Sequence, residues 1–330
     1  MNRLIVGCGY VGTEVAKSWL ADGESVYAIT RSKQRAEELK SIGVRAVVWD
    51  WYRPSDEVGN SLTLPPIQSV VVCVSHAPVS GLSPELTHTS GLKNLLNHWR
   101  SIQCNSTQEI AIPLNWCYVS TTGVYAPRDD GGWVDESSDV LPLRPGSIAA
   151  YAAEQWIQQE LCFDPGALIE KPNKTTILRA AGIYGPGRIP RLDSLQNKKP
   201  LQIDPESYLN LIHVVDLAGV IVAACDSRLP HRLYNVADGN PAKRRDYYEF
   251  IAERIGADSP QFEVPSRLSF GKELVDFPKS DRESNALQKP VARTRGEGSK
   301  RIDISRLMKD LASPFCYPSY RTGLSPLLSG

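Results

Sequence analysis

The stretch "RLIVGCGYVG", residues 3–12, decides the fold. A short apolar strand runs directly into three glycines spaced as G-x-G-x-x-G, and a helical pattern follows over residues 10–21. In such a strand–turn–helix unit, the first glycine allows a tight turn, the second lets the backbone approach a pyrophosphate, and the third lets the helix pack closely on the strand. The alternative is a purely structural turn. The predicted dinucleotide-binding residues of this loop are Gly7, Cys8, Gly9, Tyr10, Val11 and Gly12.

Strand and helix patterns alternate along the rest of the chain. Strands are expected at residues 25–30, 44–50, 69–75, 115–125, 175–185 and 232–238, and helices at 32–43, 84–103, from about 147, and at 214–226, 243–256 and 303–312. This order predicts an α/β fold, a Rossmann-type doubly wound parallel sheet with a smaller C-terminal substrate lobe. We expect the Rossmann domain at residues 1–185, completed by about 210–240, and the lobe at 186–209 and 241–330.

Composition and charge narrow the class of partner. The chain has 330 residues, of which 42% are hydrophobic, an ordinary globular composition. Its 37 basic and 37 acidic residues balance, so the charge favours neither nucleic acid nor a membrane as partner. No apolar run is long enough to span a bilayer, and strand-like residues from Leu4 leave no room for a signal peptide, so a cytoplasmic location is expected. Scattered cysteines and histidines without ligand spacing predict no metal site.

The end of the second predicted strand bears on the choice of dinucleotide. An acidic residue there would bind the ribose 2′-hydroxyl of NAD, but this chain has "TRSKQR", residues 30–35, without a carboxylate. A guanidinium suits a 2′-phosphate, so we expect NADP in preference to NAD, with Arg31 and Ser32 in contact. Asp50 ends the third strand, where an adenine amine would lie, although it could be an ordinary surface carboxylate. Ser75 completes the predicted cofactor-binding set.

Three further stretches carry a family resemblance: "VSTTGVYAP" (119–127), "ILRAAGIYGPGR" (177–188) and "NLIHVVDLAGVI" (210–221). In order and spacing they are similar to the extended short-chain dehydrogenase/reductase family, also called the NAD-dependent epimerase/dehydratase family, over about residues 1–240. The tighter glycine loop departs from the usual G-x-x-G-x-x-G of extended members and indicates an atypical branch.

The resemblance implies roles for individual residues. Thr121 corresponds to the strand-end hydroxyl that would bond the substrate oxygen, with a structural role in the strand end as the alternative. His76, in "VSHAP", would face the cofactor cleft and could touch substrate or cap a loop. Arg188 lies on the connection into the lobe and could meet a phosphorylated or nucleotide-linked small molecule, or be solvated. The number of subunits is not predicted.

The family's chemistry rests on Tyr-x-x-x-Lys, whose lysine lowers the pKa of the tyrosine. In "RPGSIAAYAAEQ" (144–155) two registers are possible. If Glu154 matches a glutamate found four residues after the family's lysine, Gly146 and Ala150 replace the pair. If Tyr151 is the catalytic tyrosine, Gln155 replaces the lysine. We favour the first register; in both, the lysine is absent.

Two functions of different classes follow. The first is an NADP-dependent oxidoreductase or epimerase of atypical type, acting on a small or sugar-like alcohol or carbonyl compound. The second is a non-catalytic protein that binds or senses NADP(H). A β-hydroxyacid dehydrogenase shares the glycine loop, but those enzymes lack the Thr-x-x-Val-Tyr segment. Turnover of NADPH separates the first two hypotheses.

Overall fold

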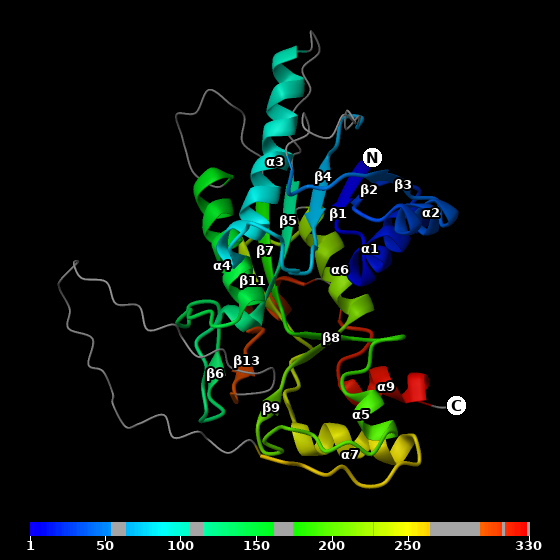
Figure 1. Cartoon of the computed structure of the whole chain (residues 1–330), viewed down its shortest axis with the longest axis vertical. Helices are drawn as coiled ribbons and strands as arrows, with labels where there is room; N and C mark the ends of the chain where they lie inside the picture. Colours follow the sequence, from blue (N-terminus) through cyan, green and yellow to red (C-terminus); the bar gives the residue numbers. More distant parts are fainter. Residues whose placement is uncertain are drawn as a thin grey trace, which may run out of the picture.

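A seven-stranded parallel sheet lies at the centre of the protein (Figure 1). The computed structural model describes residues 1–53, 64–105, 115–161, 174–226, 228–264, 298–311 and 314–328. The strand order is β11-β7-β5-β4-β1-β2-β3. The strands are β1 (Asn2–Val6), β2 (Ser25–Thr30), β3 (Arg45–Val48), β4 (Ser69–Val72), β5 (Asn115–Thr121), β7 (Lys174–Ala180) and β11 (Leu233–Val236). Every strand predicted from the sequence is confirmed, and so is the doubly wound α/β fold.

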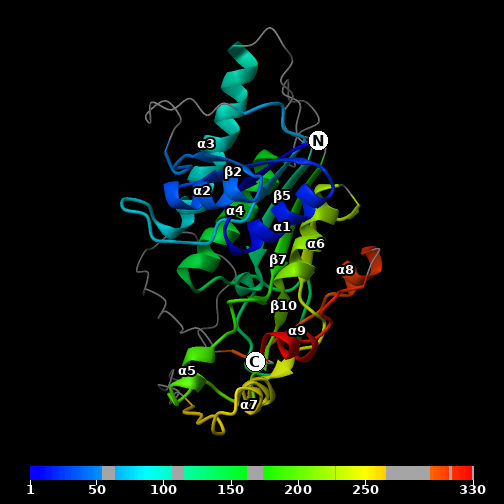
Figure 2. The same ribbon diagram turned by 90° about the vertical axis from the view of Figure 1, so that its right-hand side faces the viewer.

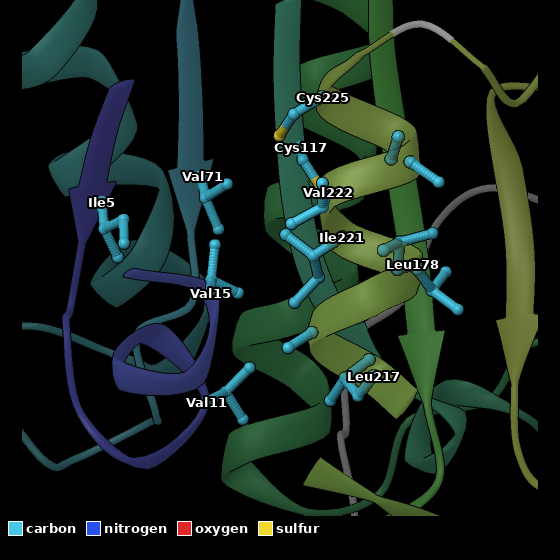
Figure 3. Close-up of a cluster of buried hydrophobic side chains, with 14 of the residues drawn as sticks. Ile5, Val11, Val15, Val71, Cys117, Leu178, Leu217, Ile221, Val222 and Cys225 are labelled. Carbon is cyan, nitrogen blue, oxygen red and sulfur yellow. The ribbon is translucent and has the colours of Figure 1, made fainter. Parts of the chain in front are cut away.

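Helices cover both faces of this sheet because its strands are apolar on both sides. Within β1, Ile5 joins the hydrophobic cluster on one face, whereas Leu4 and Val6 join the cluster on the other. Figure 3 shows the first cluster, in which side chains of α1 and α6 meet those of the strands. The first face carries α1 (Tyr10–Ala21), α2 (Lys33–Ser41) and α6 (Val214–Cys225), and the second carries α3 (Pro84–Asn105) and α4 (Pro145–Glu160).

The sheet order creates a switch point between β1 and β4. The chain winds from β1 outward to β2 and β3, and then returns through β4 to build the other half of the sheet. In doubly wound sheets, ligands bind in the crevice outside the carboxyl ends of the strands at such a point. The glycine loop follows β1, so it lies at this crevice.

A smaller group of elements lies beyond the carboxyl edge of the sheet, where Figures 1 and 2 both place α5, α7 and α9 together. These helices share a third hydrophobic cluster rich in tyrosine. The elements are α5 (Leu192–Gln196), α7 (Arg244–Arg254) and α9 (Tyr320–Leu328), the 3-10 helix η2 (Thr122–Val124), and the strand pairs β8 (Gly182–Tyr184) with β10 (Leu211–His213), β9 (Tyr208–Leu209) with β12 (Ala242–Lys243), and β6 (Trp133–Val134) with β13 (Arg301–Ile302). Helix α8 (Ser305–Asp310) packs beside β11 instead, since Leu307 joins the first hydrophobic cluster and Arg306 donates to the carbonyl oxygen of Leu233. The domain boundaries stay a prediction, and residues 265–297 of the expected lobe lie outside the described residues.

Helix α9 was not expected from the sequence. Its segment contains Gly323 and Pro326, both poor helix formers, so local propensity gives no signal. Packing explains the helix instead: a Cβ atom added to Gly323 would lie 2.2 Å from the hydroxyl oxygen of Tyr184, so only glycine lets α9 approach this ring.

The described ranges contain neither a candidate membrane span nor a cluster of metal ligands. No helix there combines the length and apolarity that a bilayer crossing needs. No three His, Cys, Asp or Glu side chains in those ranges gather closely enough to hold a metal ion.

Candidate active site

The glycine loop makes a tight turn between β1 and α1. Gly7 has a φ of 81°, and a Cβ atom added there would lie 2.6 Å from Cγ2 of Val74. At Gly12, an added Cβ would lie 2.9 Å from Cγ2 of Ile5, so this glycine lets α1 pack on β1. An added Cβ on Gly9 would meet only the carbonyl oxygen of Gly7, at 3.9 Å. Packing within the protein therefore requires Gly7 and Gly12, whereas Gly9 leaves open space beside its backbone.

Helix α1 begins in this open space. Gly9 is its N-cap and offers no side chain to the first turn, which also contains no acidic residue. The first N–H groups of a helix have no intrahelical partner, and the helix dipole adds positive potential at that end. A bare glycine backbone at a helix N-terminus fits the pyrophosphate of a dinucleotide. The residues present therefore fit the cofactor that the sequence predicts.

The segment that follows β2 and begins α2 brings two arginines to the cleft, and they differ in their contacts. Arg35 is fixed: its Nε donates to the carbonyl oxygen of Cys8 at 3.1 Å, and its Nη2 donates to the hydroxyl of Thr13. It therefore braces the glycine loop, a role that the sequence did not reveal. Arg31 is exposed at the cleft, with its guanidinium 5.2 Å from the ring centroid of Tyr52. Ser32 caps α2 by accepting from the N–H of Arg35 at 3.2 Å.

The residues that follow β3 line the cleft with tryptophan side chains and not with the predicted carboxylate of Asp50. Trp49 and Trp51 line the cleft, but Asp50 is not among the residues that do. The Asp50 carboxylate instead accepts from the N–H of Tyr52 at 3.4 Å and lies 3.7 Å from Nε of Arg53. The structure therefore does not bring Asp50 together with the other predicted cofactor residues.

One cleft of about 1770 Å³ connects the glycine loop with the carboxyl ends of β4 and β5 and with the segment after β8. The described residues lining it include eight basic side chains and a single acidic one, Asp193, and of the basic ones Arg35 and Arg128 are ion-paired with Glu38 and Asp130. The basic residues are Arg31, Arg35, Arg128, Arg144, Arg188, Arg191, Arg244 and Lys300. Such a lining attracts anions, even though the chain as a whole is neutral.

Thr121 ends β5 and lines the cleft. Its hydroxyl oxygen accepts from the N–H of Gly123 at 3.0 Å, which caps η2. The structural role considered for this residue is therefore present. A hydroxyl keeps its own proton when it accepts one bond, so Thr121 can still donate to a substrate oxygen.

Helix α4 presents Gly146, Ser147 and Ala150 to the cleft, whereas Tyr151 is not among the lining residues. Tyr151 instead packs against a small hydrophobic cluster that includes Val124 and Tyr125. Two of these three residues, Gly146 and Ala150, are those that would replace the family's pair in the first register. Neither can exchange a proton.

Ser75, His76 and Arg188 also line the cleft, each from its own segment. Ser75 and His76 follow β4, next to β5 in the sheet. The guanidinium of Arg188 lies 5.4 Å from the ring centroid of Tyr10, which in turn donates from its hydroxyl to the carbonyl oxygen of Pro186 at 3.1 Å. The loop after β8 is therefore held against the start of α1.

Lys300 is a cleft residue that the sequence did not indicate. Its Nζ donates to the carbonyl oxygen of Tyr125 at 3.2 Å. Burial lowers the pKa of Lys300 to about 8, and the nearby Arg144 acts in the same direction. No local motif could have identified Lys300, because its position in the cleft depends on a contact with a residue 175 positions away in the sequence.

Comparison with known proteins gives consistent matches. A profile described as the NAD dependent epimerase/dehydratase family matches residues 4–237. Protein YeeZ of Escherichia coli (strain K12) is 30% identical over 161 residues, 48% of this chain and 52% of YeeZ. Short-chain dehydrogenase/reductase family 42E member 1 of Danio rerio is 26% identical over 239 residues, 62% of this chain and 58% of that protein. The chain thus matches little more than half the length of these relatives.

A solved structure shares the fold. The human epimerase family protein SDR39U1, determined with NADPH, superimposes with a TM-score of 0.68 over 99% of each chain. At 17% identity this likeness concerns the fold alone.

Proposed function

The chain belongs to the NAD-dependent epimerase/dehydratase family, and from this we propose that it is an NADP(H)-dependent oxidoreductase or epimerase acting on a small or sugar-like alcohol or carbonyl compound. The observation that carries the proposal is the shared cleft, into which both the open backbone of Gly9 and the hydroxyl of Thr121 face. A nicotinamide dinucleotide bound there supplies or accepts a hydride. The protein's part is to hold that cofactor at the N-terminus of α1 and to orient the substrate oxygen at Thr121.

The basic end of β2 supports NADP over NAD. Arg31 lines the cleft and forms no ion pair with a carboxylate among the described residues, and its guanidinium can form two charge-assisted bonds to a 2′-phosphate. An acidic residue at this point, which would favour NAD, is absent from the cleft lining in the described ranges.

The cationic lining supports an anionic substrate. Six of the basic side chains come from segments other than β2 and α2, so they lie beyond the part of the cleft assigned to the adenine ribose: Arg128, Arg144, Arg188, Arg191, Arg244 and Lys300. Cations gathered in a partly buried site raise the local concentration of phosphate-bearing molecules. A phosphorylated or nucleotide-linked carbonyl compound fits this lining better than a neutral one.

The test is consumption of NADPH with a panel of aldehydes and ketones, each offered with and without a phosphate group, such as dihydroxyacetone and its phosphate. We expect turnover to favour the phosphorylated member. Thr121→Ala should lower kcat by roughly 100-fold with unchanged NADPH affinity, while Thr121→Ser keeps most activity because it retains the hydroxyl. Equal activity of wild type and Thr121→Ala would contradict the role given to Thr121.

A second candidate function is non-catalytic binding or sensing of NADP(H). It is favoured by one observation: Gly146 and Ala150 are what α4 offers to the cleft where the family uses tyrosine and lysine. Saturable NADPH binding without turnover on the whole panel would support this function and reject the first.

A further inference from the structure

The side chain of His76 lies directly beside Gly146, within van der Waals reach of a Cβ atom at that position. A Cβ atom added to Gly146 would lie 3.4 Å from Cβ of His76 and 3.8 Å from its Cγ and Cδ2. Both residues line the cleft. The absence of a side chain on the first turn of α4 is therefore matched by an imidazole that enters the same region from the segment after β4.

The same turn of α4 connects His76 with Thr121. A Cβ atom added to Gly123 would lie 3.2 Å from Oγ1 of Thr121 and 3.6 Å from Cβ of Ser147, the neighbour of Gly146. Strands β4 and β5 pair directly in parallel, so the segments that follow them leave the sheet side by side. His76 beside Gly146 and Thr121 near Ser147 therefore both border the first turn of α4 and line one cleft.

The hydrogen bonds around His76 select one neutral tautomer. The hydroxyl of Thr87 donates its only proton to the carbonyl oxygen of Pro84 at 2.8 Å. The same oxygen lies 3.5 Å from Nδ1 of His76, at the outer limit of a hydrogen bond, and can only accept there. This contact favours the neutral tautomer with its proton on Nδ1 and its lone pair on Nε2.

Among the other titratable groups of the cleft, Lys300 has a pKa lowered to about 8, but its Nζ already donates to the carbonyl oxygen of Tyr125. His88, Cys8 and Tyr125 are poorly suited to moving a proton at neutral pH. Burial lowers the pKa of His88 to about 4, with His76 contributing, and its Nδ1 already bonds the hydroxyl of Tyr118 at 2.8 Å. Burial raises the pKa of Cys8 to about 11 and that of Tyr125 above its ordinary value. An imidazole commonly serves as acid and base in enzymes.

We propose that His76 is the acid–base catalyst of this site, an inference that rests on the proposed oxidoreductase function. In reduction, the imidazolium Nε2–H gives its proton to the carbonyl oxygen while a hydride from the reduced nicotinamide dinucleotide forms the new C–H bond. The products are the alcohol, the oxidised dinucleotide and neutral imidazole, which regains a proton from solvent. In oxidation, neutral Nε2 takes the hydroxyl proton as the hydride leaves carbon for the dinucleotide.

Kinetics on the full chain test the proposal with His76→Gln, His76→Ala and the matched control His231→Gln, whose half-exposed side chain is outside the cleft lining. We expect His76→Gln to lower kcat by roughly 100-fold at unchanged NADPH affinity, and the control to retain full activity. Free imidazole should restore part of the activity of His76→Ala, because that variant leaves room for it, and none to His76→Gln. Active wild type with equally active His76 variants overturns this proposal alone; a wild type without turnover overturns the proposed function and this role with it.

A second readout needs no substrate. The chain has five histidines, so the ring signals of a ¹⁵N-histidine sample are few, and the one lost in His76→Gln belongs to His76. We expect neutral His76 to carry its proton on Nδ1, and Thr87→Val to reduce that preference. A neutral ring protonated on Nε2 would leave no lone pair facing the cleft and would overturn the proposal.

Discussion

Arg179 and Glu154 form an ion pair buried behind the cleft: Nη2 of Arg179 lies 2.6 Å from Oε2 of Glu154, and the two side chains are 4% and 0% exposed. Nε of Arg179 also donates to Oε1 of Glu154 at 3.1 Å, and the hydroxyl of Ser120 donates to the same oxygen. The pair joins α4 to β7, and Ser120 adds β5 to the connection. It thereby fixes the helix that presents Gly146 to His76.

Replacing one member of this pair should destabilise the protein strongly, whereas replacing both should destabilise it much less. Glu154→Leu leaves a buried guanidinium without its counter-charge and should lower the free energy of unfolding by about 3–5 kcal/mol. Glu154→Leu combined with Arg179→Met should recover much of that loss. Urea unfolding of the wild type, Glu154→Leu, Arg179→Met and the double variant measures the coupling free energy between the two charges. Additive losses in the double variant would show that the two charges do not depend on each other.

Substitutions at Gly7 and Gly9 should affect different properties, the stability of the fold in one case and cofactor affinity in the other. Gly7→Ala places a Cβ against Val74 at positive φ, so we expect a marked fall in Tm. Gly9→Ala meets only one backbone oxygen and should change Tm less, yet weaken NADPH binding at least 10-fold because its methyl group enters the phosphate space. Thermal unfolding and fluorescence titration give both quantities. Undiminished NADPH affinity in Gly9→Ala would support a purely structural turn.

Cofactor preference should depend on Arg31 and not on a general loss of charge. Arg31→Ala should weaken NADPH binding about 10-fold and leave NADH binding unchanged, because only NADPH has the 2′-phosphate. Lys33→Ala, an exposed neighbour on α2, is the matched control and should alter neither. Arg35→Ala should weaken both cofactors equally, since Arg35 braces the loop through Cys8. Tighter binding of NADH than NADPH by the wild type would refute the preference.

His88 should make the protein sensitive to mild acid. Burial lowers its pKa to about 4 from the ordinary value of 6.5, so the folded state binds the proton less readily than the unfolded chain. The stability that this provides is complete above pH 6.5 and is lost as the pH falls from there toward 4, by on the order of 3 kcal/mol. Replacing the imidazole in His88→Gln should flatten this limb of the stability curve. An identical pH dependence of urea midpoints in both proteins would contradict the assignment.

The parts of the fold set by local pattern could be predicted from the sequence. The bounds of α1 follow from the glycine loop and the apolar spacing after it, and each sheet strand from a short apolar run. Elements that depend on distant partners could not: β6 and β13 are two residues each and form only by pairing across the chain. Helix α9 exists because Gly323 packs on Tyr184.

The residues of the site also divide into those that could be predicted from local sequence and those that could not. Motif residues such as Gly9, Arg31 and Thr121 were predicted and do line one cleft. Asp50 and Tyr151 belong to suitable segments but are not among the residues that line it, although their neighbours Trp49 and Ala150 are. That an imidazole would lie against Gly146 could not be predicted, because this contact joins segments far apart in the chain.

The most direct test of the account is the fate of the transferable hydrogen of NADPH. With 4-deuterated NADPH in single turnover, we expect one deuterium on the carbonyl carbon of the reduced, phosphate-bearing product, and none transferred at an appreciable rate by His76→Gln. Tight, saturable binding of NADPH with all the deuterium retained on the cofactor across the whole panel would contradict an oxidoreductase and favour a protein that only binds the dinucleotide.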